Sequence, residues 1–598
     1  DRISNVHVPN PCTYFCGRDD IVNELHETLT DETKIFISGI PGIGKSEIAR
    51  AYAVKYKKEY TNVLYMTYSG NLKDDITELE FTDDEERESS EERFRRHERF
   101  LHQMKEDTLI IVDNFDVHDN DEYLDSFLGY RCRIIFTTRN NFPERFTIDV
   151  EEIDDEDMLF ALFTKFYSNA VLYKETVYEI IELLHNHTLA VELAARLLKT
   201  GILSPATLLS DLKEEKMSLR ASDKIYMKKD GKSVSATYYE HIHRLFSLYV
   251  LNSVQKNIMM NMALMPLSGL SAKLFGKWLG LSDLNDVNKL TELGFIKISS
   301  DNTIWLHPVM QEIVISEIRP GIKECRALLG KIQDICLHHG TAVPFYRTMF
   351  QVVENVISVA DKADRNDKKF YFYFLQDVFY YMDSYAYKTG MSKILEEMKY
   401  IAANESFAGT REHALTFQCM AFMADDYHEA IAFMDKAREQ IENRVNRSNA
   451  LLMSNIYANL SSYYNECYNS EKARYYLEKG IKTLVEFQMT NTHDYLVQMI
   501  NYAVLLSHTG EYEYGLQILD KVWEYVDESD TSFDYAVYLE AYGSLYLCLN
   551  EKDKAKSCFT ESLRIYSNIY ADAPALIEEK VKEINLWYQV QGLPDFQA

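Results

Sequence analysis

The hydrophobic pattern changes twice along the chain. Near the amino terminus, apolar residues form short unbroken runs at residues 34–38, 109–113 and 133–139, which is typical of strands buried on both faces of a parallel sheet. Between the first two runs, residues 47–60 carry apolar positions at helical spacing. We therefore predict that residues 1–150 form a sheet covered by helices.

Beyond this region the pattern indicates two further small domains. Residues 151–225 carry three apolar helical segments and should form a small helical domain. A polar stretch at residues 224–235 predicts a hinge. Residues 226–318 should form a winged helix, with three short helices followed by a two-stranded hairpin. Those segments are residues 254–264, 271–279, 284–293 and, for the hairpin, 295–305.

Residues 319–598 are predicted to be helical, and they repeat. Small residues recur at Ala430, Ala473, Gly515 and Ala555, at separations of 43, 42 and 40 residues. The positions around them follow tetratricopeptide repeats, in which small residues let paired helices approach closely. Each repeat buries its apolar face against its neighbours, so we expect a curved solenoid whose concave surface binds a protein.

A phosphate-binding loop follows the first strand. The segment Gly39-Ile40-Pro41-Gly42-Ile43-Gly44-Lys45-Ser46 has the G-x-x-x-x-G-K-[ST] pattern between a strand and a helix, which is the context that this motif requires. Glycines let successive backbone N–H groups face the phosphates, the lysine reaches the β- and γ-phosphates, and the serine hydroxyl binds Mg²⁺. The expected nucleotide contacts are Gly39, Gly42, Ile43, Gly44, Lys45, Ser46 and Glu47.

Two further strand ends complete the predicted ATP site. Asp113 ends an apolar run and lies where the carboxyl ends of parallel strands meet, so we expect Ser46 and Asp113 to hold Mg²⁺. Arg139 ends the third run and can direct its guanidinium at the γ-phosphate. The predicted fold is a multidomain α/β and α protein: a P-loop NTPase sheet, a helical domain, a winged helix and a tetratricopeptide-like solenoid.

The composition disfavours some classes of binding partner. The net charge is −29, which disfavours nucleic acid and anionic membrane surfaces as main partners. The third winged-helix segment carries Asp283, Asp286 and Glu292 against Lys289, too little positive charge to hold DNA. No apolar run reaches the roughly 18 residues of a membrane span. The 9 cysteines form no metal-ligand spacing, which fits a reducing cytoplasm.

The mixed charge run at residues 74–99 carries no recognisable chemistry. It contains alternating Asp, Glu and Arg residues, including Asp83-Asp84-Glu85-Glu86-Arg87-Glu88. Such runs are usually solvated helices or loops, so we expect this segment to lie on the surface.

In residues 10–318 the motifs resemble those of the NB-ARC branch of the STAND ATPases, the switch module of NOD-like receptors. Their order along the chain is the same as in that family. The matching segments are Phe15-Cys16-Gly17-Arg18-Asp19, Ile111-Val112-Asp113-Asn114-Phe115-Asp116, Phe136-Thr137-Thr138-Arg139, His187-Thr188-Leu189-Ala190-Val191-Glu192-Leu193 and Trp305-Leu306-His307-Pro308.

This resemblance implies roles for individual residues. Phe15, Gly17 and Arg18 would pack on the adenine and ribose, and Thr188 and Leu189 would lie beside the adenine. Thr188 stands near the proline of the family pattern, which is a departure. The histidine of the last segment, His307, would contact the β-phosphate of ADP; here Leu306 and Pro308 replace the usual Met and Asp.

Hydrolysis is expected to be slow. Asp113, Asp116 and Arg139 are the residues expected to support it, but Asn114 stands where many P-loop ATPases have a second acidic residue. An amide cannot accept the proton that a carboxylate accepts. Asp116 is an alternative acid two residues further on.

The resemblance implies a ligand-gated switch. ADP would hold the module closed through His307, a protein ligand on the repeats would open it, and ATP binding would drive self-association. In a bacterial chain the ligand would be a phage protein, and we expect an N-terminal effector that this chain lacks. A STAND-type transcriptional regulator and a repeat scaffold with a structural nucleotide site are the alternatives.

Overall fold

The computed structural model describes most of the chain. The described residues are 8–12, 14–79, 81–82, 84, 90–116, 121–140, 142, 145–218, 242–338, 346–359, 365–383, 387–403, 410–523, 526, 532–569 and 574–596. The predicted hinge at residues 224–235 lies outside them. The chain divides into two compact units, residues 1–84 with 90–363, and residues 85–89 with 364–598.

The first unit contains a five-stranded parallel sheet with strand order β2-β3-β4-β1-β5. The strands are β1 (Lys34–Ser38), β2 (Asn62–Thr67), β3 (Thr108–Asp113), β4 (Arg133–Thr138) and β5 (Thr147–Asp149). The three predicted runs match β1, β3 and β4, whereas β2 and β5 were not predicted. β1 lies between β4 and β5, so its loop lies beside the carboxyl end of β4, because the sheet is parallel.

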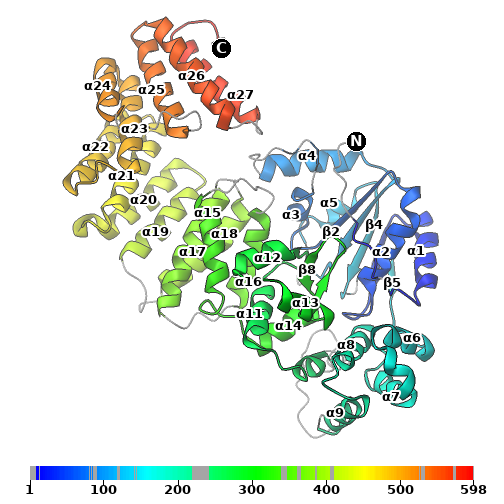
Figure 1. The fold of residues 1–598 in the computed structure, drawn as a ribbon. Helices are drawn as coiled ribbons and strands as arrows, with labels where there is room; N and C mark the ends of the chain where they lie inside the picture. Colours follow the sequence, from blue (N-terminus) through cyan, green and yellow to red (C-terminus); the bar gives the residue numbers. More distant parts are fainter. Residues whose placement is uncertain are drawn as a thin grey trace. The chain divides into compact units, whose positions relative to one another are not determined.

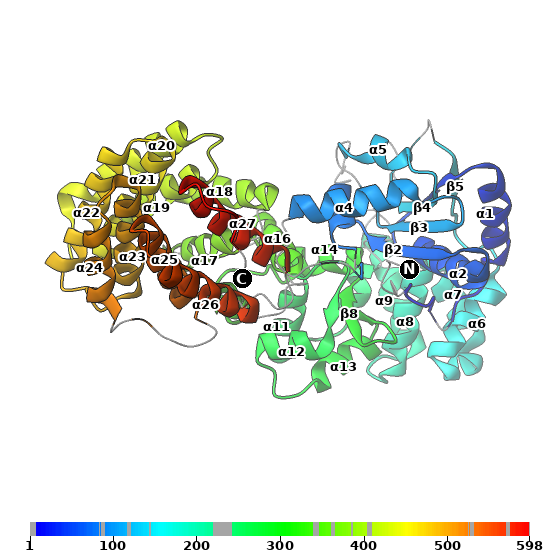
Figure 2. The ribbon, with the colours of Figure 1, turned by 90° about the horizontal axis from the view of Figure 1, so that it is seen from above.

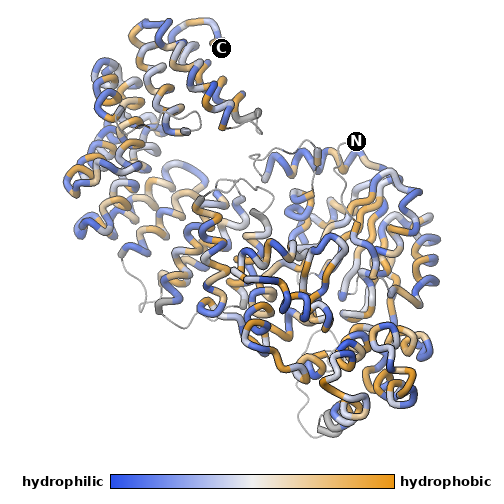
Figure 3. Tube along the Cα trace, viewed as in Figure 1, coloured by the Kyte–Doolittle hydropathy of each residue, from blue (hydrophilic) through white to orange (hydrophobic). Residues whose placement is uncertain are grey.

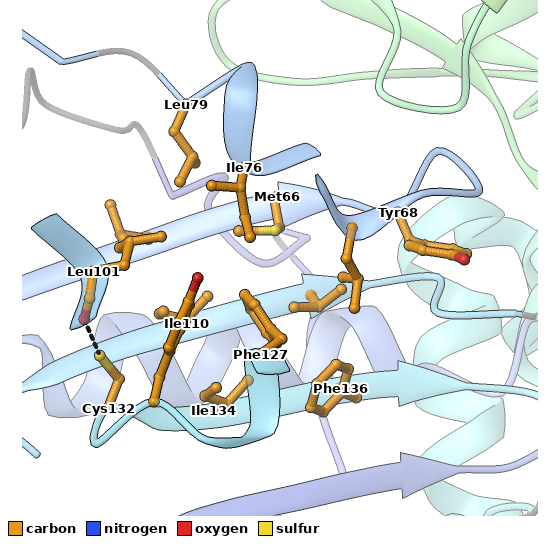
Figure 4. Packing of buried hydrophobic residues seen from close by; sticks show 14 of the residues in the cluster. Met66, Tyr68, Ile76, Leu79, Leu101, Ile110, Phe127, Cys132, Ile134 and Phe136 are labelled. Carbon is orange, nitrogen blue, oxygen red and sulfur yellow. Dashed lines mark hydrogen bonds between the residues drawn. The ribbon is translucent and has the colours of Figure 1, made fainter. Parts of the chain in front are cut away.

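Helices cover both faces of this sheet, as Figures 1 and 2 show. Alternate residues of β3 point to opposite faces: Leu109 and Ile111 pack with α1 (Asp19–Asp31) and α2 (Lys45–Tyr56). Ile110 and Val112 pack on the other face with α3 (Leu72–Thr77), α4 (Ser90–Gln103) and α5 (Leu124–Leu128). Figure 4 shows this second core, in which Ile110, Phe127 and Phe136 are buried. The sheet is thus rigidly held behind the phosphate loop.

A helical domain and a winged helix follow. The first has α6 (Glu156–Phe166), α7 (Lys174–Leu183), α8 (Thr188–Lys199) and α9 (Pro205–Ser218). The second has α11 (Ser253–Met262), β6 (Leu270–Ser271), α12 (Ala272–Leu279), α13 (Asn285–Glu292), β7 (Ile296–Ile298), β8 (Thr303–Leu306) and α14 (Pro308–Glu317). The hairpin turns at Asn302, whose φ of 64° suits asparagine. Its sheet has the order β6-β8-β7.

The second unit is a stack of antiparallel helices. They are α17 (Arg365–Asp383), α18 (Lys388–Ala402), α19 (Thr410–Phe422), α20 (Tyr427–Ile441), α21 (Ala450–Glu466), α22 (Ser470–Glu486), α23 (His493–Thr509), α24 (Tyr512–Val522), α25 (Phe533–Cys548), α26 (Lys552–Ile569) and α27 (Pro574–Val590). Ala473 and Ala555 are completely buried. A Cβ on Gly515 would lie 2.8 Å from Leu545, so only a small residue fits there. In Figure 3 the helices of this unit carry mixed hydrophobic and hydrophilic positions, as half-buried helices do.

The predicted fold class is confirmed: a parallel P-loop sheet, helical and winged-helix segments, and tetratricopeptide-like repeats. Two further helices, α15 (Arg326–His338) and α16 (Tyr346–Val359), were expected with the repeats but belong to the first compact unit. None of the helices within the described ranges has the length and apolarity needed to cross a bilayer.

Candidate functional site

The carboxyl edge of the sheet borders a cavity of about 910 Å³ within the first unit. Its walls come from the phosphate loop, the helical domain and the winged helix. Residues that show these three origins are Lys45, Leu189 and His307. The volume lies within the range of small-molecule sites, about 300–1,000 Å³.

The phosphate loop has the backbone geometry that an anion site needs. Gly39, Gly42 and Gly44 have positive φ values of 151°, 80° and 110°, a region that residues with a Cβ rarely adopt. Gly44 is the N-cap of α2 and supplies no side chain to the first N–H groups of that helix. A Cβ on Gly44 would meet nothing within 4 Å, so the space above the helix end is open. These free N–H groups suit a phosphate.

Lys45 is a buried cation that lacks a carboxylate partner among the residues described here. Its ammonium donates to the carbonyls of Gly39 at 2.8 Å and Ile40 at 3.0 Å. Burial lowers the pKa of Lys45 to about 8, although the negative charge of Asp116 opposes this shift. A phosphate placed here would supply the missing negative charge.

Ser46 and Asp113 meet as the sequence predicts. The Ser46 hydroxyl donates to Oδ1 of Asp113 at 2.6 Å, and the same oxygen accepts from the Thr137 hydroxyl at 2.5 Å. Asp113 is 1% exposed, at the end of β3. A hydroxyl and a carboxylate side by side are the oxygen ligands that Mg²⁺ prefers.

Two residues that the sequence did not indicate, Tyr65 and Arg50, also contact Asp113. Oδ2 of Asp113 accepts a hydrogen bond from the Tyr65 hydroxyl and lies 3.5 Å from a guanidinium nitrogen of Arg50. Arg50 also donates to Glu47 at 3.0 Å and to the Tyr65 hydroxyl at 3.0 Å. The only available signal was helical spacing, because Arg50 lies four residues after Ser46 and shares its face of α2.

Asp116 and Arg139 form an ion pair beside the phosphates' expected position. Nε of Arg139 donates to Oδ2 of Asp116 at 2.7 Å, and the Arg139 backbone N–H donates to Oδ1 at 2.5 Å. A second guanidinium nitrogen lies 3.2 Å from Glu312 of α14. Both predicted residues therefore line the cavity, but each is engaged by the other. Asn114 has a φ of 57° and donates its backbone N–H to Thr137 at 2.9 Å.

The helical domain holds the outer side of the phosphate loop. Nε2 of His187 lies 2.7 Å from the Pro41 carbonyl, and the Thr188 hydroxyl donates to the Gly42 carbonyl at 2.8 Å. When loop N–H groups face the ligand, loop carbonyls face outward and need donors, which these two side chains supply. His187 belongs to one of the motifs but was not predicted as a site residue. Thr188, predicted beside the adenine, lines the cavity and also contacts the loop.

His187 carries its proton on Nε2. Its Nδ1 accepts from the Ala190 backbone N–H at 3.3 Å, so the proton that reaches Pro41 is on the other nitrogen. Burial lowers the pKa of His187 to about 4, so the ring is neutral at pH 7. A neutral ring can accept and donate at the same time, which this position requires.

Apolar side chains that a base could pack against also line the cavity. Phe15 and Leu189 are two of them. Arg18 is 6% exposed, donates to the Glu151 carbonyl at 2.6 Å, and keeps a buried Nε without a partner among the described residues. Gly17 has a φ of 69° and packs against Met158 of α6.

The winged helix closes the cavity with His307 and Lys297. Nδ1 of His307 accepts from the Val309 backbone N–H at 3.3 Å, which leaves the proton on Nε2. Burial, reinforced by the charge of Lys297, lowers the pKa of His307 well below its usual value. His307 is therefore an uncharged donor. The Lys297 ammonium lies 2.9 Å from Glu192 of α8, which joins the winged helix to the helical domain.

The residues present fit a nucleoside diphosphate or triphosphate with Mg²⁺. The N-terminus of α2 and the Lys45 ammonium can bind an anion, and Ser46 and Asp113 can supply oxygen ligands to Mg²⁺. Nε of Arg18 is a buried donor that has no partner among the described residues. A bound Mg²⁺ would neutralise phosphate charge. The cavity and its edge thus define a P-loop nucleotide-binding module.

The family comparison agrees. Residues 18–155 match the NB-ARC domain, so the resemblance carried by the motifs is confirmed over that range. No curated protein matches the chain.

Several solved structures are similar in fold. A STAND protein with a tetratricopeptide repeat sensor from Pyrococcus horikoshii is 13% identical, with 99% of this chain and 92% of that chain covered and a TM-score of 0.45. Aspartyl phosphate phosphatase F from Bacillus subtilis is 12% identical, with 75% and 97% covered and a TM-score of 0.32. NprR in complex with its cognate peptide NprX is 13% identical, with 53% and 87% covered and a TM-score of 0.31.

Proposed function

We propose that this protein is a nucleotide-dependent molecular switch of the NOD-like receptor type. In the closed state ADP occupies the cavity, and the winged helix covers it. Exchange of ADP for ATP separates the winged helix from the sheet, and the opened chains self-associate and activate an effector. The repeats bind the protein ligand that triggers this exchange, which in a bacterial host is a phage protein.

One observation carries this proposal: residues of the sheet, of the helical segment and of the winged helix, all in the first unit, line one cavity. A nucleotide in that cavity contacts all of them, so its binding free energy depends on whether they are together. A ligand with different affinities for the closed and open arrangements shifts the equilibrium between them. The contacts of the winged helix that opening would break include Glu192 with Lys297 and Arg139 with Glu312.

Hydrolysis should be slow because Asp116, the acidic residue nearest to Asp113 along the chain, is held in an ion pair. Asp116 is paired with Arg139, and the residue after Asp113 is an amide, so neither supplies a free carboxylate to orient water. We propose that hydrolysis resets the switch and does not drive turnover. Single-turnover measurement with ATP should therefore give a rate well below that of P-loop enzymes specialised for hydrolysis.

The test is nucleotide binding by the full chain. Fluorescent ADP should bind the wild-type protein, and binding should require Mg²⁺ for full affinity. The double variant Lys45→Ala, Asp113→Ala removes the ammonium and the metal carboxylate together, so it should not bind. Wild-type affinity in that variant would refute the nucleotide switch and favour a repeat scaffold whose loop is only structural.

A further inference from the structure

Arg50 links the metal end of the cavity to the winged helix. Its guanidinium contacts Asp113 on β3, Glu47 on its own helix and Tyr65 on β2. It also lies over the ring of Trp305 on β8, with 5.9 Å between the guanidinium carbon and the ring centre. The side chain of Arg50 is 12% exposed, so these contacts are formed mostly away from water.

The two carboxylate oxygens of Asp113 have different partners. Oδ1 is surrounded by the hydroxyls of Ser46 and Thr137, the positions at which a metal ion or its water would bind. Oδ2 faces Tyr65 and Arg50. A cation on the Oδ1 side therefore competes with the positive charge of Arg50 for the same carboxylate.

A movement of Arg50 caused by this competition would change its contact with Trp305. Trp305 lies two residues before His307, on the strand that leads into α14. A guanidinium within about 6 Å of an indole centre is attracted to the ring face, more strongly where water is excluded. The planar, rigid fork of arginine cannot improve one contact without altering the others.

We propose that Arg50 is a positioning residue that couples Mg²⁺ at Asp113 to the winged helix through Trp305. This inference rests on the proposed nucleotide switch. When Mg²⁺ attracts the Asp113 carboxylate, the hold of that carboxylate on Arg50 weakens, and the guanidinium shifts relative to the Trp305 ring. By linkage, the Trp305 contact changes Mg²⁺ affinity to the same extent.

The experiment titrates Mg²⁺ into the full-length, ADP-loaded protein from metal-free buffer and records tryptophan emission. A Trp305→Phe variant measured in parallel assigns the signal to Trp305. Wild-type Trp305 emission should change with Mg²⁺, and Arg50→Met should abolish this response while Mg²⁺ still binds. Arg133→Met is the matched control, because the Arg133 guanidinium also lies over an aromatic ring, 5.8 Å from the centre of Tyr60. The Arg133→Met variant should keep the change in Trp305 emission with Mg²⁺.

The reverse direction is measured as apparent Mg²⁺ affinity. Trp305→Leu frees Arg50 to compete for Asp113, so Mg²⁺ should bind about two- to fivefold more weakly. In an Arg50→Met background the same change should have no effect. Arg50→Gln also removes the charge but keeps a polar side chain, and it replaces Arg50→Met if that variant fails to fold.

Two results would overturn the coupling. One is Trp305 emission that does not change with Mg²⁺ in the ADP-bound wild-type protein. The other is a loss of Mg²⁺ affinity on Trp305→Leu that persists when Arg50 is replaced. Absence of ADP binding by the wild-type chain is a different result. It would refute the proposed function itself.

Discussion

The two walls of the nucleotide cavity are held in place by different forces. The phosphate-loop wall is anchored to a buried sheet, and Lys45 is only 8% exposed. The winged-helix wall is tied to its neighbours by charged pairs: the side chains of Arg139 and Glu312 are 32% and 52% exposed, and those of Lys297 and Glu192 are 22% and 20% exposed. Partly exposed ion pairs add little stability. We therefore expect nucleotide affinity to depend mainly on the phosphate-loop wall, here called the fixed wall, and the proposed switch to move the winged-helix wall, here called the movable wall.

The largest effect should follow from Lys45→Ala on the fixed wall. Removing a buried cation that faces the phosphates should weaken ADP binding roughly a hundredfold or more. Fluorescence anisotropy of labelled ADP measures it. Lys55→Ala is the control, because Lys55 lies on the same helix and its ammonium bonds to Asn23 at 2.7 Å, away from the cavity. Equal losses in both variants would mean that the helix, and not the ammonium, matters.

The next effect concerns His187, which braces the fixed wall. Its pKa is about 4 in the folded protein and 6.5 in an ordinary setting, so the unfolded chain takes up a proton first as the pH falls. The first unit should therefore lose up to about 3 kcal/mol of unfolding free energy between pH 6.5 and 4. Urea unfolding against pH measures this loss.

His187→Gln should remove its own part of that pH dependence and leave the part that His307 contributes, because burial lowers the pKa of both rings in this unit. His493→Gln should preserve it, because the His493 side chain is 68% exposed in the repeats. An unchanged slope in His187→Gln would place the titrating group elsewhere.

On the movable wall we expect a smaller effect from Lys297 and Glu192. Burial disfavours the Glu192 carboxylate, but Lys297 and Arg196 outweigh it and hold the pKa of that carboxyl below its usual value. A double-mutant cycle of Glu192→Gln and Lys297→Met should give a coupling of about 1 kcal/mol in urea unfolding. Strictly additive losses would show that the two domains are not joined by this pair.

The smallest binding effect should come from His307. The low pKa of the ring makes His307 a neutral donor, so the charge in its bond to the β-phosphate would come from the phosphate alone. A hydrogen bond to an ionised phosphate contributes about 1.5–3 kcal/mol, so His307→Ala should weaken ADP binding at least about tenfold. The same loss should favour the open state, and light scattering with ATP should detect assembly without ligand. If the variant stays monomeric and binds ADP as tightly as the wild type, His307 serves only as the N-cap of α14.

The sequence predicted the fixed wall better than the movable one. Residues 39–46 and Asp113 are contiguous motifs at strand ends, so their meeting follows from a parallel sheet. Arg50, Tyr65 and His187 act through contacts between segments far apart in the sequence, which no local pattern encodes. The same limit explains an incorrect expectation: the charge run at 74–99 was predicted to be solvated, yet Asp75 and His97 are 5% and 1% exposed.

That buried exception has a simple physical cause. Nδ1 of His97 lies 2.8 Å from the Ile76 carbonyl, and Nε2 lies 2.7 Å from Asp84. Each polar atom is thus satisfied locally, which removes the main cost of burial. Composition describes the average exposure of such a run, but the pairing that permits burial depends on how α3 and α4 pack.

Hydrogen exchange of the segment 303–310 tests the central claim most directly, because this segment belongs to the movable wall and contains Trp305 and His307. If one nucleotide holds both walls, ADP with Mg²⁺ should slow exchange there as well as in residues 39–50, and Lys45→Ala should lose both effects. Protection confined to residues 39–50, with unchanged exchange at 303–310, would contradict the account: nucleotide would bind, but the winged helix would not sense it.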